Sequence, residues 1–287
     1  MTTQHIQHIP TRSPAWQGWQ LTGSTAQAYE RFLVPAIFAP WGRELVRLAD
    51  PAPDARVLDV ACGTGVLARI AADRLRADAR ITGVDINPDM IAVARTVAPE
   101  RDRPIVFGVG DACSLDLPGA DFDTVLCQQA LQFFDDRAAA LSEMRRVLVP
   151  GGRVALSVLR PRRHNRAYGH FADALEHHVG SDAGAMMRAP FPDLAADDLR
   201  GLLHGAGFDQ VAIRIAVTSV RYPSVAEMVR QETVSSPLAA HLAGVDDASR
   251  AALVEETGRL LADHLDDEGV VLPVETYLAT AERPALD

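Results

Sequence analysis

The segment from Val57 to Arg69 reads VLDVACGTGVLAR: a short apolar run, two glycines one residue apart, then a run of helical character. Glycine adopts backbone angles that other residues resist, and its missing side chain lets a ligand approach the backbone closely. A strand, a glycine loop and a helix in this order are typical of α/β proteins that bind nucleotide-like ligands. A tight turn that binds nothing has the same pattern, so the loop alone leaves both interpretations open.

Short β-branched runs alternate with segments of helical periodicity from residue 56 to residue 159. This alternation is typical of a parallel sheet flanked by helices. The pair Asn87-Pro88 supplies an N-cap and a proline in the first helical turn, so a helix is expected to begin there. The strands predicted in this region are Arg56–Ala61, Arg80–Asp85, Ile105–Val109, Phe122–Cys127 and Arg153–Leu159.

The pattern changes on both sides of this region. Ala26–Leu48 is apolar but interrupted by Pro35 and Pro40, which predicts short helices. After residue 160, helices are expected at 162–179, 197–206 and 224–267, and long strands at 210–221 and 274–281.

Composition narrows the class of partner. The chain has 287 residues and a formal net charge of −10, which repels phosphate backbones and argues against DNA or bulk RNA as a substrate. No apolar run is long enough to span a bilayer, and the first residues lack the apolar stretch of a secretory signal, so a cytoplasmic location is expected. The three cysteines show no CxxC spacing, which indicates neither a disulfide framework nor a zinc site.

Two acids indicate which ligand the glycine loop suits. An ionised Asp59 beside the loop would repel the pyrophosphate of a nicotinamide cofactor, but it favours a ligand with an ammonium group and a sulfonium centre. Asp85 ends the second predicted strand, where open α/β sheets place their ligands. There its carboxylate can accept hydrogen bonds from both hydroxyls of a ribose. The pair therefore predicts a positively charged nucleoside as the ligand.

Five motifs resemble, in the same order, those of the class I S-adenosylmethionine-dependent methyltransferases, and especially the small-molecule branch that includes the ubiquinone and menaquinone biosynthesis methyltransferases. The motifs are DVACGTG, GVDINPDMI, GDACSLDLP, DFDTVLCQQALQFFDD and MRRVLVPGGRVALSV. The resemblance implies an α/β fold with a Rossmann-like seven-stranded sheet, mostly parallel with an antiparallel edge hairpin, flanked by helices. A mainly helical cap over the substrate is implied as well.

The resemblance also implies S-adenosyl-L-methionine as the cofactor. It places Asp85 on the ribose, Ile86 and Met90 beside the adenine, and Asp111 on the exocyclic amine. Tyr29 would lie over the methionine end, although ordinary helix packing explains that tyrosine equally well. The cofactor residues implied are Tyr29, Asp59, Ala61, Gly63, Gly65, Asp85, Ile86, Met90, Gly110, Asp111, Ala112, Gln128 and Phe133.

The same resemblance predicts how the chain is divided. Residues 1–55 would form an N-terminal arm and helices over the cofactor, and residues 56–159 the cofactor-binding core. Residues 160–196 would form a helical cap insertion. Residues 197–287 would complete the core, with a second helical insertion at 224–267.

Candidates for the chemistry of substrate binding and proton removal are fewer. His170 and His177 lie seven residues apart, on one face of a predicted helix, and either could remove a proton, although surface or packing roles are common for such histidines. No cluster of metal-binding spacing occurs, so no metal is predicted. The residues expected to contact the substrate are Gln129, Gln132, Met186, Met187 and Phe191.

Three functions compete at this point. The first is methyl transfer to an oxygen, nitrogen or carbon nucleophile of a small, largely apolar metabolite. The second is a protein of the same fold that binds S-adenosylmethionine without transferring its methyl group, such as a cyclase or a sensor. A nicotinamide-dependent oxidoreductase is disfavoured by Asp59. The partner expected is a small molecule, and both a monomer and a homodimer stay open.

Overall fold

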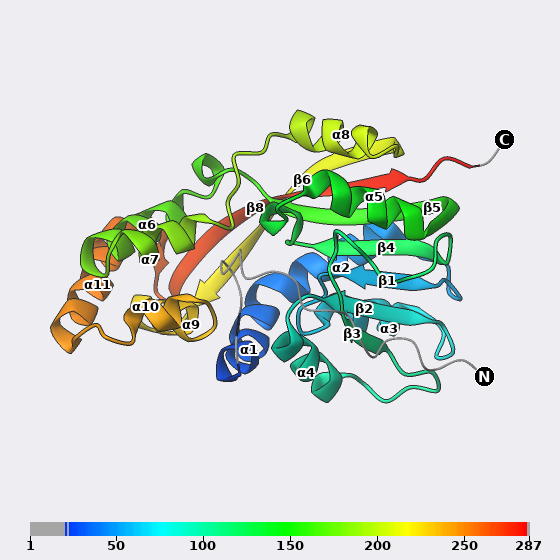
Figure 1. Cartoon of the computed structure of the whole chain (residues 1–287). Coiled ribbons are helices and arrows are strands. Elements are labelled where there is room, and N and C mark those ends of the chain that lie inside the picture. The colour runs from blue at the N-terminus through cyan, green and yellow to red at the C-terminus, as the bar shows by residue number, and fades with distance from the viewer. Residues whose placement is uncertain (1–20, 22, 286–287) are drawn as a thin grey trace.

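The computed structural model describes residue 21 and residues 23–285 of the chain. Its sheet has the order β3-β2-β1-β4-β5-β8-β6, in which β1 to β5 are parallel and β8 runs antiparallel to both β5 and β6 (Figure 1). The strands are β1 Val57–Val60, β2 Ile81–Asp85, β3 Val106–Val109, β4 Phe122–Gln128, β5 Leu148–Leu159, β6 Asp209–Tyr222, β7 Leu265–Asp266 and β8 Gly269–Glu282.

Helices cover both faces of this sheet. Buried side chains of α2 (Ala39–Ala49), α3 (Val66–Arg74) and α4 (Pro88–Val97) share one apolar cluster with one face, and those of α5 (Arg137–Val147) and α8 (Ala196–Gly205) share a second cluster with the other. The α/β class and the mostly parallel sheet are therefore confirmed. Asn87 also caps α4 as predicted, because its side chain accepts hydrogen bonds from the amides of Asp89 and Met90.

The sheet differs from the prediction by one strand and by the length of two others. The two-residue β7 lies inside the stretch predicted to be helical and pairs with the start of β8. There, Arg221 on β6 makes two hydrogen bonds of 2.8 Å to Asp266. β8 begins at Gly269 rather than Val274, and β5 begins at Leu148 rather than Arg153. Pairing with β6 and β7 extends β8, and parallel pairing of Leu148 with Phe122 on β4 extends β5.

The first described helices run without a break where short, separate helices were expected. α1 (Ser24–Ala28) continues into a π-helix over Tyr29–Phe38 and then into α2. Pro35, which lacks a backbone N–H, lies inside the wider π-turns and does not end the helix. This continuous helical segment places Tyr29 near the carboxyl ends of the parallel strands, where Tyr29 lines a cavity.

The antiparallel pair β6–β8 extends beyond the rest of the sheet. β5 ends at Leu159, opposite Thr276, whereas β8 continues in register with β6 back to Val270, and Gly269 pairs with β7. We call the paired segments 217–222 and 269–275 the arm. Five helices surround it at the left of Figure 1 and pack on one another, and we call them the cap: α6 Arg166–His178, α7 Ser181–Arg188, α9 Val225–Val234, α10 Leu238–Leu242 and α11 Asp247–Leu260.

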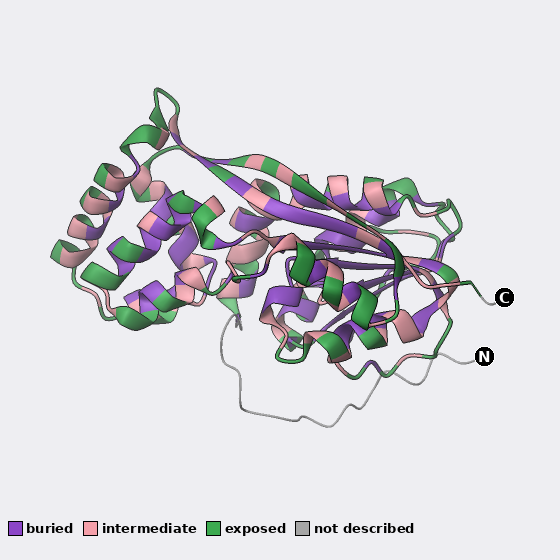
Figure 2. Cartoon of the chain, turned by 90° about the horizontal axis from the view of Figure 1, so that it is seen from above, coloured by how far each residue is buried: buried purple, intermediate pink, exposed green. Residues whose placement is uncertain are grey.

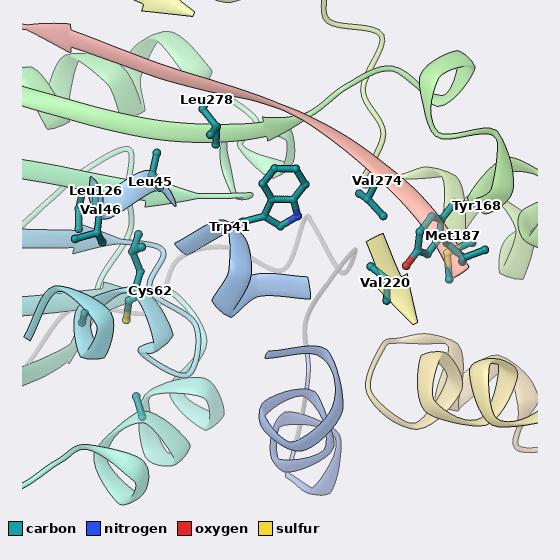
Figure 3. Packing of buried hydrophobic residues seen from close by; sticks show 14 of the residues in the cluster. Trp41, Leu45, Val46, Cys62, Leu126, Tyr168, Met187, Val220, Val274 and Leu278 are labelled. Carbon is teal, nitrogen blue, oxygen red and sulfur yellow. The ribbon is translucent and has the colours of Figure 1, made fainter. Parts of the chain in front are cut away.

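A single apolar cluster runs from the sheet into the cap. It includes Leu126 on β4, Trp41 on α2, Val274 on the arm and Tyr168 on α6. Figure 3 shows Val274, Tyr168 and Met187 on the cap side of this cluster, away from Leu126 on the sheet. Figure 2 shows the same distribution for the whole chain, with buried residues along the strands and the inner sides of the helices. The cap is therefore fixed to the sheet by continuous packing.

Two further sequence predictions can be compared with the described residues. Within them, no helix combines the length and the apolar character needed to cross a membrane. All three cysteines are free thiols, and Cys62 and Cys127 are buried. The sequence predicted no secretory signal at the N-terminus. That prediction concerns residues 1–20, which lie outside the described residues.

Candidate active site

The glycine loop between β1 and α3 contains three residues with left-handed backbone. Ala61, Gly63 and Gly65 have φ angles of 54°, 54° and 80°, and Gly65 is the N-cap of α3. A Cβ atom at Gly63 would meet no protein atom within 4 Å, whereas one at Gly65 would lie 2.6 Å from the Phe107 ring. Gly63 therefore leaves its space to a ligand, and Gly65 allows the loop to pack closely against β3.

Asp85 lies at the end of β2 and is held by two backbone amides. Its Oδ2 accepts a hydrogen bond of 2.7 Å from the Gly63 amide, and its Oδ1 accepts one of 2.8 Å from the Asn87 amide. Burial raises the pKa of this carboxyl, and the two amide bonds lower it. Each carboxylate oxygen can accept more than one bond, so the fixed carboxylate keeps the capacity to bind two hydroxyls.

Asp59 is directed away from the position predicted for it. Its side chain is 1% exposed, and its Oδ2 accepts a hydrogen bond of 3.0 Å from the Ala68 amide in the first turn of α3. Burial is the main cause that raises the pKa of Asp59 to about 8. Asp59 does not line the cavity described next, and its direct contact is with the start of α3, so its place among the cofactor residues stays a prediction.

One cavity of about 500 Å³ runs from the glycine loop to the cap. Of the predicted cofactor residues, only Asp59 and Gly65 do not line it; of the predicted substrate residues, only Met186 does not, because it packs against the hydrophobic core. The predicted residues that do line it are Tyr29, Ala61, Gly63, Asp85, Ile86, Met90, Gly110, Asp111, Ala112, Gln128, Phe133, Gln129, Gln132, Met187 and Phe191.

Three glutamines line the cavity at and just after the end of β4, and they differ in how they are held. Gln128 donates a 2.7 Å bond from Nε2 to the Phe38 carbonyl, and Gln129 donates a 2.9 Å bond from Nε2 to Thr276 Oγ1. Gln132 is 8% exposed, and neither its Oε1 nor its Nε2 has a hydrogen-bond partner among the described residues. Buried polar atoms are normally hydrogen-bonded, so Gln132 indicates that a polar ligand binds here.

The charged residues that line the cavity are all acidic. Among the described residues that line it there is no lysine, arginine or histidine. An acidic lining attracts a cation and opposes the entry of an anion. The acidic residues that line it are Asp85, Asp111, Asp135, Asp136 and Glu232.

The two histidines predicted as catalytic lie elsewhere. His170 lines a separate surface depression together with Arg162 and Arg166. The His177 side chain is 69% exposed and its Nδ1 lies 2.7 Å from Glu256 Oε2. The apolar side of α6 faces the core, so the side that carries the histidines faces outward. Neither residue lines the cavity, and their catalytic assignment stays a prediction that the geometry does not support.

A three-ligand group occurs where no metal was predicted. His177, His178 and Glu256 place their ligand atoms within 4.8 Å of one another. Hydrogen bonds from both imidazoles to the Glu256 carboxylate account for this arrangement without an ion.

Sequence reasoning missed the acid at the cap end of the cavity. Glu232 on α9 is 2% exposed, and Tyr168 beside it also lines the cavity. The signal available was the helical pattern of α9, in which Met228, Val229 and Glu232 all fall on the buried side. An acid at a position where the helical period calls for an apolar residue is the feature that could have revealed it.

S-adenosylmethionine fits these residues on three observations. Ile86 is an apolar side chain that is 53% exposed beside Met90 in the cavity, so an adenine ring would cover it. Gln132 has polar atoms that lack partners. The acidic lining suits the sulfonium and ammonium charges.

Comparison with known proteins agrees with this geometry. A model of the methyltransferase domain matches residues 58–156. Nocamycin O-methyltransferase of Saccharothrix syringae is 30% identical over 242 residues, which cover 79% of this chain and 85% of that protein.

Two further relatives match over shorter segments. Aklanonic acid methyltransferase of Streptomyces sp. (strain C5) is 35% identical over 139 residues, 48% of this chain, and demethylmenaquinone methyltransferase of Thermus thermophilus is 39% identical over 116 residues, 40% of this chain. The matched segments span only 63% and 52% of those proteins.

Among solved structures, a [4+2]-cyclase superposes with a TM-score of 0.54 at 22% identity, covering 94% of this chain and 87% of that one. That likeness establishes the fold alone. The near full-length match to the nocamycin enzyme, together with the domain match, establishes the family. The chain belongs to the S-adenosylmethionine-dependent methyltransferases.

Proposed function

We propose that this protein transfers the methyl group of S-adenosylmethionine to an oxygen, nitrogen or carbon nucleophile of a small, largely apolar metabolite. The observation that carries the proposal is the continuity of one cavity, which Asp85 lines at the strand edge and which Met187 and Phe191 line in the cap. Its volume of about 500 Å³ lies within the range typical of small-molecule sites. Both reactants can therefore meet in one enclosed space.

The strand-edge half would hold the cofactor. Asp85 would accept the ribose hydroxyls, Ile86 and Met90 would flank the adenine, and Asp111 would accept from its exocyclic amine. When bound, S-adenosylmethionine supplies an electrophilic methyl carbon on sulfur and leaves as a neutral thioether. The leaving group needs no acid, so the chain is left with the tasks of orienting the acceptor and excluding water.

The cap half would hold the acceptor. Residues 160–196 and 224–267 bring Phe191 and Glu232 to the cavity that residues 56–159 line from the other side. Gln129 and Gln132 follow β4 between the two halves and can orient a polar group of the acceptor. Holding acceptor and methyl in line can lower the barrier by roughly 7–11 kcal/mol.

The names of the relatives and the chemistry of the chain support the remaining parts of the proposal. The nocamycin and aklanonic acid enzymes are named for small molecules. The negative net charge disfavours nucleic acid as a substrate. A cytoplasmic location is consistent with three free cysteines.

Calorimetry with S-adenosylhomocysteine and with NAD tests the cofactor, and release of S-adenosylhomocysteine across a panel of apolar phenols, amines and enols tests the transfer. We expect binding of the thioether, no binding of NAD, and turnover of a panel member. Protein that ignores the thioether would overturn the whole proposal. Tight binding without turnover of any acceptor would favour the non-transferring alternative.

A further inference from the structure

A carboxyl group is buried where the cap closes the cavity. Glu232 Oε1 accepts a hydrogen bond of 2.5 Å from Tyr222 Oη and one of 3.3 Å from Tyr168 Oη. The two tyrosine oxygens are 3.5 Å apart. The three residues come from the arm, α6 and α9, so the cluster forms only when the cap is folded.

The surroundings of this carboxyl are apolar and hold no cation. Glu232 is 2% exposed, and its carboxyl accepts hydrogen bonds from the hydroxyls of Tyr168 and Tyr222. Val274 and Met187 line the same end of the cavity. Burying a carboxylate without a cationic partner costs several kcal/mol, so a residue that serves only packing is a poor explanation.

The two tyrosine hydroxyls fix the position of the Glu232 carboxyl, and Glu232 still lines the cavity. Tyr222 is fully buried and does not line the cavity, whereas Tyr168 and Glu232 do. Burial raises the pKa of Glu232, and the two hydroxyl bonds lower it. The tyrosines bond one oxygen of Glu232, and the residue lines the cavity, so its carboxyl can reach a ligand there.

We propose that Glu232 is the catalytic base of this methyltransferase and that the acceptor is an uncharged hydroxyl compound, a phenol or an enol, rather than a carboxylate. The inference rests on the proposed function. The hydroxyl proton passes to a Glu232 carboxylate oxygen while an oxygen electron pair forms the new bond to the methyl carbon. The bond from that carbon to sulfur breaks, and its electron pair stays on the neutral thioether. Glu232 returns its proton to water when the product leaves.

The charge of the cavity supports the second part of this proposal, that the acceptor is an uncharged hydroxyl compound. Of the five acidic residues that line the cavity, Asp85 and Asp111 are assigned to the cofactor and two others are exposed, so a carboxylate acceptor in the cap half would meet Glu232 with no described cationic side chain beside it. Like charges brought together in an enclosed site cost several kcal/mol. A neutral hydroxyl avoids that repulsion, and it needs the base that a carboxylate nucleophile does not need.

The first experiment compares wild type with Glu232→Gln. Glutamine keeps the size of the side chain and can still accept from a tyrosine, but it cannot take a proton. With a panel acceptor such as 2-naphthol we expect kcat to fall by about 10²–10⁴-fold and the alkaline rise of the wild-type pH profile to disappear. Glu227→Gln, a carboxyl on the same helix outside the cavity, is the matched control and should keep wild-type kcat.

The second experiment needs no turnover. Calorimetry on the complex with S-adenosylhomocysteine compares 2-naphthol with 2-naphthoate, and we expect wild type to prefer the neutral compound by at least about tenfold. Glu232→Gln should narrow that preference. An equal affinity for the two compounds, or a Glu232→Gln variant with wild-type kcat and pH profile, would overturn the proposal.

The outcomes separate this proposal from the proposed function. Loss of S-adenosylhomocysteine binding in wild type defeats both. Retained thioether binding with a naphthoate preference defeats the neutral hydroxyl acceptor and leaves the proposed methyl transfer standing. The Tm of the Glu232→Gln variant shows whether the cluster still folds, and Tyr222→Phe provides a milder change that keeps the carboxyl.

Discussion

The two ends of the cavity are held in different ways. At the strand edge, Asp85 is fixed by the backbone amides of Gly63 and Asn87, two residues of the loops around it. At the cap, Glu232 is fixed by side chains, Tyr168 and Tyr222, that come from segments far apart in the sequence. The strand-edge end therefore depends on local loop geometry, whereas the cap end depends on the packing of several elements. A sequence motif therefore determines which residues form the strand-edge end of the cavity. Tertiary packing determines which residues form the cap end.

The largest expected effect tests the strand-edge end. Asp85→Ala removes two charge-assisted hydrogen bonds of about 1.5–3 kcal/mol each, so affinity for S-adenosylhomocysteine should fall by about 10²–10⁴-fold in calorimetry. Asp73→Ala, an exposed acid on α3, is the control. An Asp85→Ala variant with wild-type affinity would refute the ribose assignment.

The next effect tests the cap end and should leave the strand-edge end intact. Phe191 lines the cavity and packs on Tyr168 with 5.4 Å between ring centroids. Phe191→Ala should weaken acceptor binding by about tenfold to a hundredfold, because burial of such a side chain contributes about 1.5–3 kcal/mol. Affinity for the thioether should change by less than about threefold. A parallel loss of both affinities would show that the ends are not independent, and Val217→Ala on the exposed side of β6 is the control.

A smaller effect concerns Asp59, which belongs to the strand-edge end without contacting the cavity. Its pKa of about 8 in the folded protein lies above the ordinary value of 3.8, so the native carboxyl keeps a proton that the unfolded one loses. This contribution to stability is present below pH 4 and is lost as the pH rises to about 8.

Urea unfolding at pH 5 and pH 8 checks this sign. Asp59→Asn can still accept the Ala68 amide bond but does not titrate, so between these pH values it should lose at least about 1 kcal/mol less stability than wild type. Parallel losses in the two proteins would contradict a raised pKa at Asp59.

The smallest effect is expected for a substitution at His177, which lies at neither end of the cavity. His177→Gln changes a side chain that is 69% exposed and bonded to Glu256. Its kcat/KM should stay within about twofold of wild type, and the free energy of unfolding should change by less than about 1 kcal/mol. A tenfold fall in kcat/KM at unchanged stability would place His177 in the chemistry.

The sequence predicted the strand-edge end because its information is local. Glycines and Asp85 follow the strands that position them, so order along the chain becomes proximity at the carboxyl edge of the sheet. The contact of Asp59 was not predicted: the packing of α3 over β1 brings the Ala68 amide within 3.0 Å of its carboxylate. Spacing along the strand carries no information about that distance.

The cap end could not be predicted in the same way. Tyr168, Tyr222 and Glu232 meet only through the arm, and no sequence spacing encodes their contact. His170 and His177 do share one side of α6, but packing turned that side outward. Periodicity identifies a helical face, whereas the partner of each face is a property of the whole fold.

The arm has a mechanical consequence. Because the cap packs on paired strands and shares one apolar cluster with the sheet, cap and sheet are joined as one solid body. A cavity-creating substitution in that cluster, such as Val274→Ala, is therefore expected to loosen both ends of the cavity together.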